Sequence, residues 1–102
     1  MPTLLSKAIV RDAISRLHGW TGDTGGIART LTLSASEHND FLERIKVCSD
    51  AMNHRPVIRR GGDQTQVWLC TTDEGGITEC DIALAARINA IVRIVAPPSP
   101  PA

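Results

Sequence analysis

The sequence predicts an α+β domain whose elements follow the order helix, two strands, helix, two strands, helix. Three segments carry apolar residues at helical spacing, and each follows a serine or threonine suited to capping a helix. Two pairs of shorter segments, separated by glycine-containing turns, lie between them. The 102 residues, 42% of them hydrophobic, suffice for one core. We therefore expect a single domain over residues 1–96 and a flexible proline-rich tail over residues 97–102.

The first third of the chain predicts one helix and two strands. Ser6 can cap a helix that runs through Leu17. Its apolar residues are expected on one side, with Ile9, Ala13 and Leu17 on one face and Val10 and Ile14 beside them. A short strand is expected from Trp20, a turn over residues 23–26 and a second strand over residues 27–33.

The second helix is predicted from a capping box. In Ser34-Ala35-Ser36-Glu37, the serine hydroxyl can accept from the third amide of the helix while the glutamate reaches back. The apolar stripe of this helix consists of Phe41, Ile45, Cys48 and Met52. The helix is expected to end near Met52, because a residue that precedes proline avoids the helical region and Pro56 follows closely.

The last third predicts two strands and a helix. We expect a strand near residues 57–58, a turn over residues 60–63 and a longer strand over residues 64–72. Thr78 resembles a second cap, with Asp81 at the third helical position. The apolar face of the final helix consists of Leu84, Ile88, Ile91 and Val95.

Composition argues against several classes of function. Eleven basic and eleven acidic residues leave no formal net charge, so we expect no nucleic-acid or membrane partner. The apolar runs are too short to span a bilayer, and we expect no signal peptide. The three cysteines form no Cys-x-x-Cys pair, which predicts a reduced, cytoplasmic protein. Metal-ligand spacings are absent, and no metal or other cofactor is expected.

Two stretches stand out for their chemistry. Residues 50–56 read Asp-Ala-Met-Asn-His-Arg-Pro, and residues 72–81 read Thr-Asp-Glu-Gly-Gly-Ile-Thr-Glu-Cys-Asp. Together they resemble the signature of the pterin-4a-carbinolamine dehydratases. That signature has an acidic residue, three further residues and His-His-Pro, and later Thr-His-Glu, two small residues, an aliphatic residue, Ser/Thr-Glu and Asp. Asp50, His54 and Pro56 match its first part.

The resemblance implies a fold and a reaction. The fold is a four-stranded antiparallel sheet with three helices on one face, in a homodimer or larger oligomer that extends the sheet. The reaction is dehydration of 4a-hydroxytetrahydropterin to quinonoid dihydropterin. It requires one proton to be taken from the pterin ring and one to be given to the leaving hydroxide. That is general acid–base work suited to imidazoles.

The sequence departs from the family at two of its three histidines. Arg55 stands at the second histidine and Thr72 at the third. Arginine stays protonated and cannot act as a base, and threonine does not titrate. By resemblance, Arg55, Thr72 and Asp73 are expected to contact a pterin through hydrogen bonds.

Two interpretations of the remaining polar residues stay open. His54, oriented by Asp50 one helical turn earlier, is the candidate catalytic pair. Alternatively, His54 closes a helix C-terminus and Asp50 is a solvated charge. Arg59 and Arg60 either contact a protein partner or keep an edge strand soluble.

Three functions fit the resemblance. The first is a family member with a degraded active site that works as an assembly factor, like the branch encoded with carboxysomes that assists Rubisco. The second is an active or slow 4a-hydroxytetrahydrobiopterin dehydratase that uses His54. The third is a dimeric module like the transcription-factor-stabilising members. The expected partners are a second copy of the chain, Rubisco or another protein, and a pterin, in the cytoplasm or at a carboxysome.

Overall fold

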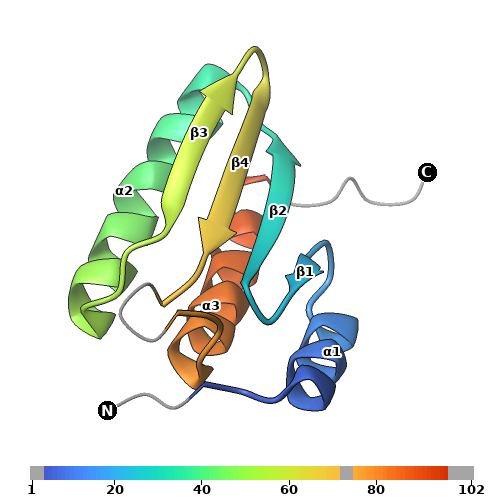
Figure 1. The fold of residues 1–102 in the computed structure, drawn as a ribbon. Helices are drawn as coiled ribbons and strands as arrows, with labels where there is room; N and C mark the ends of the chain where they lie inside the picture. The colour runs from blue at the N-terminus through green and yellow to red at the C-terminus, as the bar shows by residue number, and fades with distance from the viewer. Residues whose placement is uncertain (1–3, 72–74, 97–102) are drawn as a thin grey trace.

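Three helices lie on one face of a four-stranded antiparallel sheet, as predicted (Figure 1). The computed structural model describes residues 4–71 and 75–96. The elements are α1 (Lys7–Arg16), β1 (Thr21–Asp23), β2 (Gly26–Thr32), α2 (Ala35–Met52), β3 (Val57–Gly61), β4 (Gln64–Leu69) and α3 (Glu79–Val95). Within these residues no helix covers the opposite face of the sheet, which faces the viewer in Figure 1.

The sheet has the order β1-β2-β4-β3, so β1 and β3 are its edges. Each hairpin supplies one central strand, and these pair with Ile27 opposite Leu69 and Leu31 opposite Thr65. The β3–β4 turn is tighter than predicted. It consists of two residues, with Gly62 at φ +59°, a left-handed conformation that favours glycine. As a result β3 reaches Gly61.

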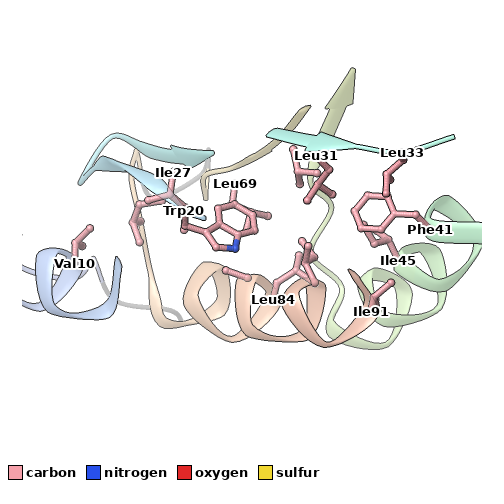
Figure 2. Packing of buried hydrophobic residues seen from close by; sticks show 14 residues of the cluster. Val10, Trp20, Ile27, Leu31, Leu33, Phe41, Ile45, Leu69, Leu84 and Ile91 are labelled. Atoms are coloured by element: carbon pink, nitrogen blue, oxygen red, sulfur yellow. The ribbon is translucent and has the colours of Figure 1, made fainter. Parts of the chain in front are cut away.

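The core lies between the sheet and the helices (Figure 2). Strand alternation places Ile27 and Leu31 of β2, and Val67 and Leu69 of β4, on the helix-facing side. The helices contribute Val10, Phe41, Ile45, Leu84, Ala85, Ile88 and Ile91. Most of the predicted apolar stripes are therefore confirmed.

Helix α1 differs from the prediction. Ile9 is 54% exposed, whereas Val10 is 1% exposed and is the residue of α1 that reaches the core. The helix is only ten residues long and packs beside the three-residue edge strand β1, so its buried surface is narrow. Ile9 falls outside that contact.

The predicted caps are present at all three helices. The Ser6 hydroxyl accepts from the amide of Ile9, and Ser34 forms a complete capping box with Glu37. Strand β4 ends at Leu69, earlier than predicted. Among the described residues, no helix is long and apolar enough to cross a membrane. The predicted tail, residues 97–102, lies outside the described residues.

Candidate active site

The ring of His54 lies against the buried carboxylate of Asp81, 27 residues later in the sequence. Helix α2 ends at Met52, and its C-cap Asn53 adopts a left-handed conformation (φ 51°, ψ 42°) that turns the chain off the helix axis. The imidazole Nε2 of His54 then lies 2.5 Å from Oδ1 of Asp81, in the first turn of α3. The side chains are 13% and 0% exposed.

The Asp81 carboxylate is held by several donors. Its Oδ2 accepts from the backbone amide of Thr78 at 2.9 Å and from the Thr71 hydroxyl at 2.7 Å. Thr78 is the N-cap of α3, and the positive end of the helix dipole also favours an anion there. The other oxygen, Oδ1, is the one that faces the ring of His54 and can accept a hydrogen bond from it.

The contact with Asp81 determines which ring nitrogen of His54 carries the hydrogen. Because a carboxylate has no hydrogen to give, Nε2–H of His54 donates to Asp81. The other nitrogen, Nδ1, makes no hydrogen bond with residues 4–71 or 75–96. In the neutral ring Nδ1 is therefore the atom that can accept a proton from a ligand.

Asp50 does not orient His54, contrary to our prediction. The four-residue spacing would place both side chains on one face only if the helix continued, and it ends at Met52. Instead, Oδ1 of Asp50 lies 3.7 Å from Nη2 of Arg55, in a pair whose side chains are 50% and 84% exposed. Such an exposed, long ion pair contributes at most about 1 kcal/mol.

Comparison with known proteins identifies the family. The sequence matches the family described as Pterin 4 alpha carbinolamine dehydratase over residues 3–91. The chain belongs to this family. A dehydratase-family protein from Nitrobacter winogradskyi is 36% identical over 79% of this chain and 83% of its own length. Another, from Nitrobacter hamburgensis, is 35% identical over 91% and 95% respectively. Both are named "Putative pterin-4-alpha-carbinolamine dehydratase".

Two solved structures share the dehydratase fold. A transcriptional coactivator/pterin dehydratase from Brucella melitensis superposes with a TM-score of 0.82 at 26% identity, over 87% of this chain and 98% of that one. A pterin dehydratase-like protein identified as a RuBisCO assembly factor in the alpha-carboxysome has a TM-score of 0.55 at 20% identity. It covers 71% of this chain and 84% of its own, and that likeness shows the fold alone.

Only one of the other two histidine positions of the dehydratase signature, Arg55, falls within the described residues. Arg55 lines a hollow of about 220 Å³ between α2 and β3, together with Leu42, Ile45, Lys46, Ser49, Asp50, Pro56 and Ile58. Thr72 and Asp73 lie outside the described residues. The ends of the loop that carries them are fixed, because the Thr71 amide donates to the Gly76 carbonyl at 2.9 Å. Thr71, the last described residue before Thr72, donates its hydroxyl to Oδ2 of Asp81.

The neighbouring cysteine is not activated. Burial, and then the negative charge of Asp81, raise the pKa of the Cys70 thiol above its ordinary value. The thiol therefore stays protonated near neutral pH and is a poor nucleophile. No cluster of His, Cys, Asp and Glu in the described part of the chain could hold a metal ion.

Sequence reasoning assigned Asp81 and Thr78 only to a helix cap and gave Thr71 no role. The Thr78-x-x-Asp81 pattern predicted their mutual bonds, and these bonds are present. The contact with His54, 27 residues earlier, depends on the fold. The indication in the sequence that Asp81 belongs to the site was its match to the last aspartate of the dehydratase signature.

Arg59 and Arg60 line the same hollow of about 260 Å³, but their side chains make different contacts. Side chains alternate along β3, and Arg59 stands opposite Gln66 on the open face of the sheet. Nη1 of Arg60 instead donates to the hydroxyl of Thr65, a fully buried residue on the helix-facing side. Arg60 therefore belongs to a contact within the fold, and Arg59 is the better placed of the two for a partner.

Proposed function

We propose that this chain is a dehydratase-family protein that acts mainly by binding and assembly, with little turnover. One observation carries the proposal: the buried carboxylate is paired with a single imidazole, His54, whose Nε2 is already committed to Asp81. Dehydration needs both an acid and a base, and one imidazole with one available nitrogen supplies one of them. Arg55 lines a different hollow, and a guanidinium does not serve as a general base.

The partner we propose is Rubisco, in the cytoplasm or at a carboxysome. The fold shared with the RuBisCO assembly factor supports this choice, together with the two replaced histidines. The open face of the sheet offers a contact surface, because Trp68 and Val57 are paired across β3 and β4 and are 46% and 55% exposed. Arg59 follows on the same face.

The test is co-purification with purified Rubisco subunits. We expect Arg59→Glu to reduce recovery of the complex, because it reverses the charge beside the exposed pair. Arg87→Glu, an equal charge change on the exposed side of α3, is the control and should have no effect. If the wild-type protein recovers no Rubisco, the proposal that Rubisco is the partner is wrong. Equal losses in both variants would remove Arg59 from the interface.

A second candidate function is slow pterin dehydration by His54. The intact His54–Asp81 pair favours it, since a carboxylate behind an imidazole fixes the ring and its tautomer. Calorimetry with a stable dihydropterin tests whether the site takes this ligand. His54→Gln should weaken binding about tenfold, the equivalent of one hydrogen bond of about 1.4 kcal/mol. His18→Gln, at an exposed histidine, should not.

A further inference from the structure

A hollow with two arginines in its lining lies toward the opposite end of α3 from the His54 site. It measures about 270 Å³ and is lined by His18, Arg29, Asn89, Val92, Arg93 and Ala96. Arg93 lies twelve residues beyond Asp81 along the helix, about 18 Å at 1.5 Å per residue. The hollow is therefore separate from the site described above.

Arg29 is held in place by a fixed amide. Its Nη1 donates to Oδ1 of Asn89 at 2.5 Å, and the same oxygen accepts from Nε1 of Trp20 at 2.8 Å. The Asn89 amide nitrogen donates to the carbonyl of His18 at 3.3 Å. The guanidinium also packs on Gly19, where an added Cβ would come within 2.7 Å of Nε. The remaining donors of Arg29 are thus presented in a defined orientation.

Within the described residues, the hollow contains positive charge without an acidic side chain in its lining. None of the six lining residues is acidic. Among residues 4–71 and 75–96, neither Arg29 nor Arg93 forms an ion pair. Burial, and then the charge of Arg93, lower the pKa of Arg29 below its ordinary value. Two arginines that repel each other in a partly desolvated hollow would be stabilised by an anion.

We propose that this hollow is a binding site for a small organic anion, with a carboxylate or phosphate group held by Arg29 and Arg93. Asn89 is the positioning residue that holds Arg29. The side chains of Val92 and Ala96 supply an apolar wall for the rest of the ligand. The proposed role of His54 involves none of these residues.

The fluorescence of Trp20 can report on ligand binding in the hollow, because Trp20 and Arg29 donate to the same oxygen of Asn89. The chain has two tryptophans, and Trp68 is 46% exposed on the sheet. In Trp68→Phe the remaining indole is Trp20, bonded to the same oxygen as Arg29. Inorganic phosphate and acetate are titrated separately at constant ionic strength, with sodium chloride as the control salt. Emission and calorimetry are recorded on the same solutions, so that binding without a change in emission is still detected.

We expect saturable binding of phosphate, acetate or both, and the stronger of the two identifies the chemical group. Arg93→Gln in the same background should weaken it about tenfold or more, since one charge-assisted contact is lost. Arg87→Gln, the same change about 1.7 turns earlier on α3, should alter it less than about twofold. The proposal is overturned if neither anion binds by either readout, if chloride gives the same response, or if Arg87→Gln and Arg93→Gln weaken binding equally.

Discussion

At the scale of single residues, the Asp81 carboxylate accepts bonds from His54, Thr71 and Thr78 with no exposure to solvent. Asp81→Asn preserves the size but presents an NH₂ group to donors that need an acceptor. We expect it to lower the free energy of unfolding by about 1–3 kcal/mol, measured by urea denaturation. Asp40→Asn, which breaks only an exposed pair with Arg44, is the control and should cost less than about 1 kcal/mol. Equal losses would contradict a structural role for Asp81.

A second residue-scale prediction concerns pH. The Nδ1 of His38 lies 2.8 Å from the hydroxyl of Thr65, which also accepts from Arg60. Burial, and then the charge of Arg60, lower the pKa of His38 below 6.5 in the folded protein. As pH falls below 6.5, the unfolded chain takes up this proton first, so folding loses stability on acidification.

His38→Gln should therefore lessen the fall in melting temperature between about pH 7.5 and 5.5, relative to wild type, because glutamine takes up no proton in that range. His18→Gln is the matched control and should keep the wild-type pH dependence. A His38→Gln protein with an undiminished fall on acidification would show that this network does not favour the neutral ring.

At the scale of elements, two capping boxes differ in what surrounds them. Ser34 begins α2 in an exposed position, whereas Thr78 begins α3 with no exposure and also bonds Thr71 across 2.9 Å. Ser34→Ala should cost about 1 kcal/mol of unfolding free energy, the usual loss for a cap. Thr78→Ala should cost more, because a buried hydroxyl network loses a member. Chemical denaturation of the two variants gives the comparison, and the reverse order would contradict it.

Local patterns predicted most of the elements. The caps at Ser6, Ser34 and Thr78 and the strand β2 depend on residues a few positions apart, and they are present as expected. The prediction that Asp50 orients His54 was wrong. It assumed that the helix continues to His54, whereas the helix ends at Met52 and Asn53 is left-handed. The contacts of Asp81 and of Arg60 depend on which elements the fold brings together, which no local pattern contains.

At the scale of the whole molecule, we predict a homodimer or larger oligomer through the β3 edge and α2. Val57 is 55% exposed at that edge and Val47 is 71% exposed on α2. Light scattering at micromolar concentration should give at least twice the chain mass. Val57→Lys should shift the population toward monomer, because like charges would meet across paired edges. Ile9→Lys, at a residue 54% exposed on α1, should not. A monomeric wild type would contradict the prediction.

A protein with one imidazole at this site should support little dehydration. The direct measurement is the stopped-flow rate of dehydration of synthetic 4a-hydroxytetrahydropterin. We compare the wild type, His54→Ala, Arg55→His with Thr72→His, and a family member with all three histidines. Each acid–base group contributes on the order of 10² to 10⁴ in rate, although such losses need not multiply. We predict a wild-type rate at least about 10² below that of the three-histidine enzyme, with a further loss in His54→Ala and a gain in the double variant. A wild-type rate equal to that of the three-histidine enzyme would contradict the proposed loss of catalysis.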